Sequence, residues 1–188
     1  EGNTWEKMSE ALPARPLVWR LAQSPRGDLY LGCVKGRPGG VWKYDFTMNK
    51  WNRLSTVGEV EYAHTLYTGG ENEEDLVFVA AHGNKGGLYR SDDGGKTWTK
   101  IFREGVSAFD RAPGGTVMYV GGEGIFRSTD RGKEWKEVYG MPYRCPGHEV
   151  VGITIDPADP ETIWVATSGG GIWRGPGKGV PEEKTDIR

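Results

Sequence analysis

The chain of 188 residues is long enough for one domain or a little more, and its charges are nearly balanced, with a formal net charge of −2. Because no block of like charge is present, nucleic acid is not expected as a partner, and because no apolar run reaches membrane-spanning length, no membrane insertion is expected. Thirty glycines and eight scattered tryptophans favour many short strands joined by tight turns.

Taken in chain order, the sequence divides into four units, each with strand-like runs separated by glycine and proline. The first unit predicts strands at residues 18–23, 28–32, 40–44 and 51–54, and the second at 62–67, 76–80, 87–91 and 97–102. The third predicts strands at 106–109, 116–120, 124–128 and 134–138, and the fourth at 150–155, 162–167 and 171–174, where the pattern stops. Runs this short have strand lengths, and no window has a sustained period of 3.6. The predicted fold class is therefore all-β.

One glycine opens the third strand of every unit: Gly40, Gly87, Gly124 and Gly171, spaced 47, 37 and 47 residues apart. Four-stranded units near this length are typical of β-propeller blades. We therefore expect residues 1–188 to form a single β-propeller domain or propeller segment of about four blades. The chain could be a closed small ring, a fragment, or half of a larger ring. A fragment or a two-chain ring is favoured, because four blades lie at the bottom of the usual range.

The start of the chain resembles the end of a unit. Residues 2–8, Gly-Asn-Thr-Trp-Glu-Lys-Met, match the back half of the turn and the fourth strand of the other units. The fourth unit lacks this strand, so the N-terminal strand at 2–8 is predicted to complete a last blade with residues 149–174. Such closure would leave no exposed sheet edge. Four tryptophans then mark four fourth strands: Trp5, Trp51, Trp98 and Trp135.

The turn before the fourth strand carries a repeated motif. Ser91, Asp93, Gly95, Thr97 and Trp98 fit the pattern S-x-D-x-G-x-T-W, and Ser128, Asp130, Gly132 and Trp135 fit it with Glu134 replacing threonine. This motif resembles the Asp-box, or BNR repeat, of the superfamily of β-propellers that includes sialidases, xyloglucanases and sortilin. Residues 155–165 similarly resemble the first hairpin of blades in xyloglucanase-like and sortilin-like propellers, and residues 44–51 look closer to a kelch blade.

The residue types of the motif suit a turn clamp. A short aspartate side chain can accept hydrogen bonds from turn amides, which is the expected role of Asp93 and Asp130. The glycines supply positive φ, and the tryptophans pack under the turn. Because Asp-Gly turns normally need no metal, these residues are interpreted as structural, and no metal or cofactor is expected.

Two further columns recur in all four units. The aromatic column consists of Trp42, Tyr89, Phe126 and Trp173, and packing between blades is favoured over a carbohydrate-stacking strip. The cation column consists of Lys43, Arg90, Arg127 and Arg174, which are expected to be solvated or ion-paired at blade edges.

In β-propellers the loops between second and third strands share one face with the loops between blades; we call this the loop face. Here it would comprise residues 33–39, 81–86, 121–123 and 168–170, together with inter-blade loops such as 55–61 and 139–149. Function usually lies on such loops, above a rigid scaffold. The candidate ligand-binding residues are Tyr143, Arg144, His148, His82, Lys85 and Arg37, with ordinary solvated loop residues as the alternative.

The preferred function is a non-catalytic scaffold that binds a glycan or a protein through the loop face. The alternative is part of a xyloglucanase-like glycoside hydrolase, which would need two carboxylates across a cleft. The candidate carboxylates are Glu123, Glu149, Asp110 and Glu61. Sialidase activity is disfavoured, because the entry motif Phe/Tyr-Arg-Ile-Pro is absent. A purely architectural assembly module is a third hypothesis, so enzymatic activity is left open.

The partner and the location follow from the resemblance. It implies carbohydrate or another protein as the partner and an extracellular or periplasmic location, while a homodimer or additional blades from a longer chain could complete the ring. Two cysteines far apart in sequence, Cys33 and Cys145, make no disulfide framework. We favour two separate thiols, with a single disulfide as the alternative.

Overall fold

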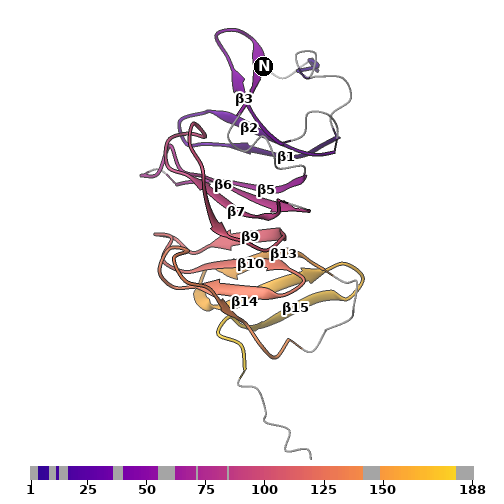
Figure 1. Cartoon of the computed structure of the whole chain (residues 1–188), viewed down its shortest axis with the longest axis vertical. Coiled ribbons are helices and arrows are strands. Elements are labelled where there is room, and N and C mark those ends of the chain that lie inside the picture. The colour runs from indigo at the N-terminus through magenta and orange to yellow at the C-terminus, as the bar shows by residue number, and fades with distance from the viewer. Residues whose placement is uncertain are drawn as a thin grey trace, which may run out of the picture. The chain divides into compact units, whose positions relative to one another are not determined.

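The computed structural model describes residues 4–8, 12, 17–35, 40–54, 62–70, 72–83, 85–141 and 149–180. This part of the chain consists of strands and turns without a helix, so the all-β prediction is confirmed. Strands that follow one another in the chain are neighbours in four sheets (Figure 1). Neighbours pair antiparallel, for example β1 with β2 and β13 with β14. Each sheet is the blade of a β-propeller.

The strand boundaries lie within three residues of those expected from sequence. The first blade contains β1 (Leu17–Gln23), β2 (Leu29–Lys35), β3 (Gly40–Asp45) and β4 (Lys50–Arg53), and the second contains β5 (Tyr62–Thr68), β6 (Val77–His82), β7 (Gly87–Ser91) and β8 (Thr99–Phe102). The third contains β9 (Val106–Arg111), β10 (Met118–Gly122), β11 (Ile125–Ser128) and β12 (Lys136–Glu137). The fourth contains β13 (Val150–Asp156), β14 (Asp159–Thr167) and β15 (Gly171–Pro176), and has three strands among the described residues.

The chain divides into two compact units, the first comprising residues 1–79 and 90–99. In this unit the first blade packs against β5 where β2 carries Gly32. A Cβ on Gly32 would lie 3.0 Å from the carbonyl oxygen of Ala63 and 3.3 Å from the Cβ of Ala63. A cluster of buried side chains from β2, β3 and β4 forms its core: Leu31, Cys33, Trp42, Tyr44 and Trp51. The missing side chain at Gly32 is therefore what lets the two sheets approach.

The second unit comprises residues 80–89 and 100–188. Its core lies between the third and fourth blades and includes Ala108, Tyr119, Ile125, Val150, Ile153, Ile155, Ile163 and Val165. Burial of aliphatic side chains from both sheets drives this packing. Here Gly121 of β10 faces Val150 and Ile153 of β13, again without room for a side chain.

Every blade pairs an aromatic ring on its second strand with a cation on its third. The cation-to-ring distances are 5.3 Å for Lys43 over Tyr30, 6.0 Å for Arg90 over Phe78, 5.9 Å for Arg127 over Tyr119 and 5.4 Å for Arg174 over Trp164. The same cations form ion pairs, of Lys43 with Asp28, Arg90 with Asp92, Arg127 with Glu161 and Arg174 with Asp156. The cation column thus stabilises the sheets locally, by cation–π contact and charge pairing.

The aromatic column is less uniform than the sequence suggested. Trp42 is buried, whereas Tyr89, Phe126 and Trp173 are half-buried. The Phe126 ring packs on Phe102 at a centroid distance of 5.0 Å, which is the inter-blade contact expected. Tyr89 and Trp173 instead donate hydrogen bonds to backbone carbonyls nearby in the chain. Burial and contacts therefore differ along the column, although its position in the repeat is the same.

Residues 4–8 form no strand in the structure. They lie against the first blade, where the indole N–H of Trp51 donates to the Met8 carbonyl at 2.9 Å. Pairing of the N-terminal segment with residues 149–174 therefore stays a prediction.

Candidate binding groove on the loop face

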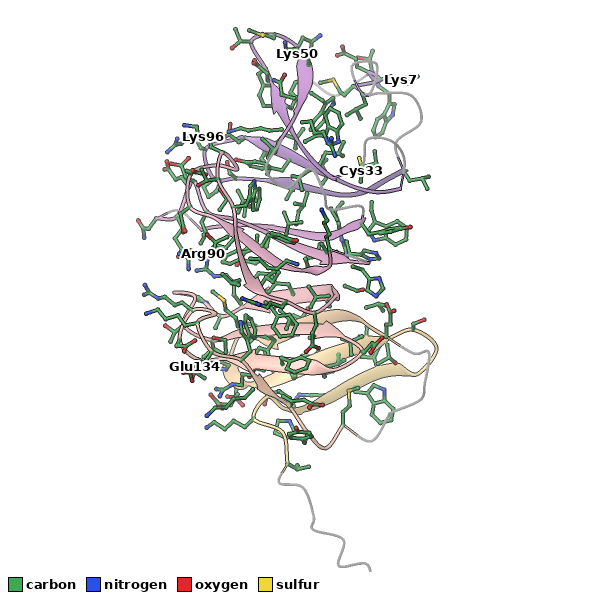
Figure 2. All side chains as sticks on the ribbon, in the orientation of Figure 1. Lys7, Cys33, Lys50, Arg90, Lys96 and Glu134 are labelled. Atoms are coloured by element: carbon green, nitrogen blue, oxygen red, sulfur yellow. The ribbon has the colours of Figure 1, made fainter. Side chains whose placement is uncertain are left out.

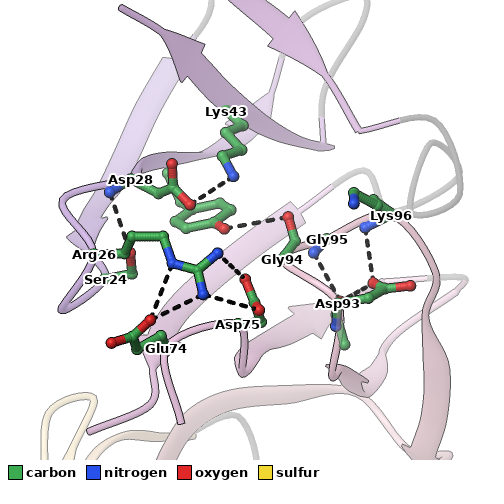
Figure 3. Close-up of polar contacts among 12 residues, drawn as sticks. Ser24, Arg26, Asp28, Lys43, Glu74, Asp75, Asp93, Gly94, Gly95 and Lys96 are labelled. Atoms are coloured by element: carbon green, nitrogen blue, oxygen red, sulfur yellow. Dashed lines mark hydrogen bonds and ion pairs between the residues drawn. The ribbon is translucent and has the colours of Figure 1, made fainter. Parts of the chain in front are cut away.

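The first Asp-box is a set of hydrogen bonds within one turn, and Figure 3 shows those that Gly95 and Lys96 make there. Ser91 Oγ accepts from the Gly95 amide at 2.8 Å and donates to Asp93 at 2.8 Å. The Asp93 carboxylate also accepts from the amides of Lys96 and Thr97 and from the Thr97 hydroxyl, at 3.0, 2.8 and 2.6 Å. Gly95 has φ +90°, where a side chain would be strained. Each residue of the motif thus satisfies a polar group or a backbone angle of the turn.

The second Asp-box repeats this geometry without the hydroxyl bond to the aspartate. Ser128 Oγ accepts from the Gly132 amide at 2.8 Å, and Asp130 accepts from the amides of Lys133 and Glu134, both at 2.9 Å. Glu134 occupies the place of Thr97 and offers no hydroxyl. The indole N–H of Trp135 donates to Ile101 O, at 2.9 Å, and to Gly132 O. The box therefore anchors the third blade to the fourth strand of the second.

The extra hydroxyl predicts different acidities for the two aspartates. The Thr97 hydroxyl and amide lower the pKa of Asp93 to about 2, and backbone donation by Glu134 lowers the pKa of Asp130. Because the folded pKa of Asp93 lies below its ordinary value, its contribution to stability is complete above pH 4 and is lost as the pH falls towards 2. We expect Thr97→Val to raise the pKa of Asp93 and leave Asp130 unchanged, as followed by NMR titration of the carboxyl carbons. An unmoved Asp93 would show that the hydroxyl plays no part.

A groove of about 510 Å³ opens on the loop face of the second unit. Three turns form it: the one after β6, the one between β8 and β9, and the one between β10 and β11. Its lining consists of His82, Gly83, Phe102, Glu104, Gly105, Val106, Gly122, Glu123, Gly124 and Phe126.

Glycines bring these turns into backbone contact. A Cβ on Gly122 would lie 2.4 Å from the carbonyl oxygen of Gly105, and a Cβ on Gly86 would lie 2.6 Å from the Gly105 Cα. Side chains at these positions would push the turns apart. The groove is therefore shaped by main chain as much as by side chains.

The aromatic lining of the groove is supported from the Asp-box side. Phe102 and Phe126 pack tilted at 52°, and Phe102 also meets the Trp135 ring edge-on at 5.3 Å. Such aromatic pairs hold each ring in a fixed orientation. The box tryptophan thus positions a phenylalanine that lines the groove.

Acidic groups dominate the polar lining. Glu104 and Glu123 are exposed, and neither forms an ion pair with a described residue. His82 Nε2 lies 3.2 Å from Glu149 Oε1, and Glu149 also accepts from Ser107 at 3.4 Å. No lysine or arginine is among the described residues that line the groove. The groove therefore favours neutral or cationic ligands over anionic ones.

Sequence reasoning identified part of this groove. His82 and Glu123 line it, and Glu149 contacts His82. Lys85 lies in the neighbouring β6–β7 turn, where its carbonyl accepts from Tyr89. Glu104 and Phe102 were not among the candidates, although Glu104 and Gly105 lie in a turn between blades, and Phe126 was assigned to packing between blades rather than to a binding site.

Asp110 lies between β9 and β13 and not in the groove. Burial raises the pKa of Asp110, and its carboxylate accepts from the Ile155 amide at 2.8 Å, which ties β9 to β13. It does not line the groove. The other predicted residues, Arg37, Glu61, Tyr143, Arg144 and His148, lie outside the described residues, as does Cys145. Cys33 is a buried free thiol, and its burial raises its pKa.

Four-stranded antiparallel blades with boxes between third and fourth strands define a repeat β-propeller protein. The family model described as BNR-Asp box repeat matches residues 88–101 and 125–138. The chain therefore contains two copies of the BNR/Asp-box repeat and has the blades of a β-propeller, as its sequence predicts. No curated protein is detectably similar to it in sequence.

Three solved structures share the fold. A GH74 enzyme of Niastella koreensis superposes with a TM-score of 0.67 at 17% identity, over 86% of this chain and 28% of that one. An auxiliary nutrient binding protein of Bacteroides thetaiotaomicron superposes with a TM-score of 0.60 at 16% identity, over 86% of this chain and 38% of that one. The structure of YCF48 bound to D1 peptide superposes with a TM-score of 0.56 at 15% identity, over 82% of this chain and 49% of that one. The chain thus spans less than half of the length of each of these proteins. No helix in the described residues is long and apolar enough to cross a membrane.

Proposed function

We propose that the chain is a non-catalytic propeller scaffold that binds a neutral glycan in the loop-face groove. The observation that carries this proposal is the combination of the half-buried Phe126 ring, packed on the buried Phe102, with the exposed carboxylates of Glu104 and Glu123 in one open groove. Aromatic faces suit the apolar faces of sugar rings, and carboxylate oxygens accept hydrogen bonds from sugar hydroxyls. The acidic lining disfavours uronic or sialic acids.

Two of the four candidate carboxylates have structural partners, which supports a binding role over a hydrolytic one. Asp110 holds backbone amides, and Glu149 is paired with His82. Similar folds occur in a nutrient binding protein and in a peptide-bound propeller, so a glycan or a protein ligand is compatible with this architecture. An extracellular or periplasmic location would agree with such a role.

Binding is tested by titration calorimetry with soluble neutral β-glucans, an acidic polygalacturonate and a basic peptide. We expect the neutral glucan to bind, and Phe126→Ala to weaken it about tenfold, the loss expected for one stacked ring. Glu134→Gln, on the Asp-box turn and outside the groove, is the matched control and should bind like the wild type. If only the basic peptide binds, the ligand of the groove is a protein and the glycan proposal is wrong.

The glycoside hydrolase alternative is supported by one observation. Glu104 and Glu123 line the same groove, so two carboxylates could flank a bound sugar. This alternative predicts that the pure chain releases reducing ends from a β-glucan and that Glu123→Gln abolishes the release. Such a result would overturn the non-catalytic proposal.

A further inference from the structure

Polar groups from three blades meet beside the groove at Glu149, which directly precedes β13. Its Oε1 lies 3.2 Å from His82 Nε2, and its Oε2 accepts from the Ser107 hydroxyl at 3.4 Å. Its backbone carbonyl accepts from the Ser168 amide at 2.9 Å. These contacts join the second, third and fourth blades within the second unit. Because both its main chain and its two carboxylate oxygens have partners, Glu149 is held in one orientation.

A bulge in β9 brings the Ser107 hydroxyl to Glu149. The register of β9 against β10 shifts between Gly121 and Gly122, which makes Ser107 the extra residue of a β-bulge. Such a bulge bends its strand locally and re-aims a side chain. Ser107 is buried, so its hydroxyl needs a polar partner, and the Glu149 carboxylate provides one. The position of the carboxylate is thus built into the strand pairing of the third blade.

A glycine fixes the other side of the His82 ring. A Cβ on Gly105 would lie 3.3 Å from His82 Cδ2 and 3.7 Å from His82 Nε2, so the imidazole lies where a side chain at this position would project. The His82 side chain is 39% exposed and lines the groove. The imidazole is therefore held between Gly105 and Glu149 and presented to a ligand in one orientation.

Glu149 decides which nitrogen of the imidazole carries the hydrogen. An ionised carboxylate only accepts hydrogen bonds, so at 3.2 Å it keeps a hydrogen on His82 Nε2, and in the neutral ring Nδ1 then has none. Among the lining residues that the structure describes, His82 has the one side chain that can donate a hydrogen bond. With that hydrogen committed to Glu149, the described side chains of the groove offer a ligand the acceptors of Glu104 and Glu123 and no donor.

We propose that Glu149 is a positioning residue that sets the specificity of the groove: by holding the His82 hydrogen, it makes the groove select ligands that donate hydrogen bonds over ligands that accept them. This inference rests on the proposed glycan binding and names the class of glycan. Sugars with free hydroxyl groups donate to the two glutamates. Sugars whose hydroxyls are acetylated or oxidised to carboxylates bring acceptors against acceptors, which leaves both sides unpaired.

Titration calorimetry with a soluble β-glucan oligosaccharide and its deoxyfluoro analogues tests the ligand class. Fluorine has nearly the size of a hydroxyl group but cannot donate a hydrogen bond. We expect replacement of a hydroxyl that donates to Glu104 or Glu123 to weaken binding about tenfold or more, as for a bond to a charged group. Equal affinity for the parent and every analogue would overturn the selection of donors and leave glycan binding in place. Binding of none of them would overturn the proposed function, and this inference with it.

Glu149→Ala tests the positioning role, because it releases the His82 hydrogen and leaves both groove carboxylates in place. We expect affinity for an oligogalacturonate, which brings acceptors, to rise about tenfold, the gain from one charge-assisted hydrogen bond. Glu104→Ala removes one negative charge from the groove but keeps the His82–Glu149 contact, so its gain should be smaller. Glu134→Gln is the control for a charge lost outside the groove and should bind like the wild type, since Glu134 is exposed on the edge of the third blade (Figure 2). No gain for Glu149→Ala, or equal gains for the two alanine variants, would contradict the positioning role.

Nitrogen NMR of the wild type reads the state of the imidazole without a ligand or a substitution. At about pH 8, where histidine is ordinarily neutral, we expect a hydrogen on His82 Nε2 and none on Nδ1. A hydrogen on Nδ1, alone or together with one on Nε2, would show that Glu149 does not remove the imidazole as a donor. That result would overturn the inference even if the groove binds a glycan.

Discussion

Replacing Trp135 with alanine is expected to lower the free energy of unfolding by about 2–4 kcal/mol, somewhat less than the about 3–5 kcal/mol of a fully buried tryptophan, because its ring is half-buried. The substitution removes an indole that bonds to Ile101 O and packs against Phe102. Urea unfolding, followed by circular dichroism, measures the loss. Because Phe102 lines the groove, ligand affinity should fall with stability.

The control for this prediction is Glu134→Ala in the same turn. Glu134 is exposed, and its backbone amide, which bonds to Asp130, survives the substitution. We expect a change within about 0.5 kcal/mol. A loss below about 1 kcal/mol for Trp135→Ala would contradict the role of the box as an inter-blade anchor.

Replacing Gly121 with valine is expected to destabilise the second unit by about 3 kcal/mol, the cost of overpacking a dense interior. A Cβ at this position would lie 2.4 Å from Val150 Cγ1 and 2.8 Å from Ile153 Cδ1. Both neighbours are buried, so they have little room to shift. Thermal unfolding should show the loss as a lower melting temperature.

Gly175→Val is the matched control for Gly121→Val. Gly175 is also a strand glycine, but a Cβ there would meet no heavy atom within 4 Å. We expect a change within about 0.5 kcal/mol. Equal losses at the two positions would show that the cost comes from strand glycine itself and not from the packing of the two blades.

The strands and boxes were predictable because their causes are local. A glycine stands at or next to the start of the third strand of every unit, and Asp93 and Asp130 bond to amides within four residues of themselves. Such turn chemistry needs no knowledge of distant residues. The ion pairing of Lys43, Arg90 and Arg127 was likewise anticipated from one repeat position.

The groove was only partly predictable, because it depends on which side chains converge after the blades pack. Asp110 and Glu123 look alike as candidate carboxylates in sequence. In the structure Asp110 turns to the Ile155 amide, whereas Glu123 lines the groove. Glu104 joins it from an inter-blade turn that carries no motif.

By itself, the sequence determined the all-β class, the four repeat units, the strand boundaries within three residues and the Asp-box turns. These follow from hydrogen bonds and backbone angles between residues near in the chain. Only the tertiary structure decided which loop residues share a groove, that Trp135 supports Phe102, and that residues 4–8 lie against Trp51. Those contacts join residues far apart in sequence, and close packing of whole sheets, to which glycines such as Gly32 and Gly121 are essential, sets their geometry.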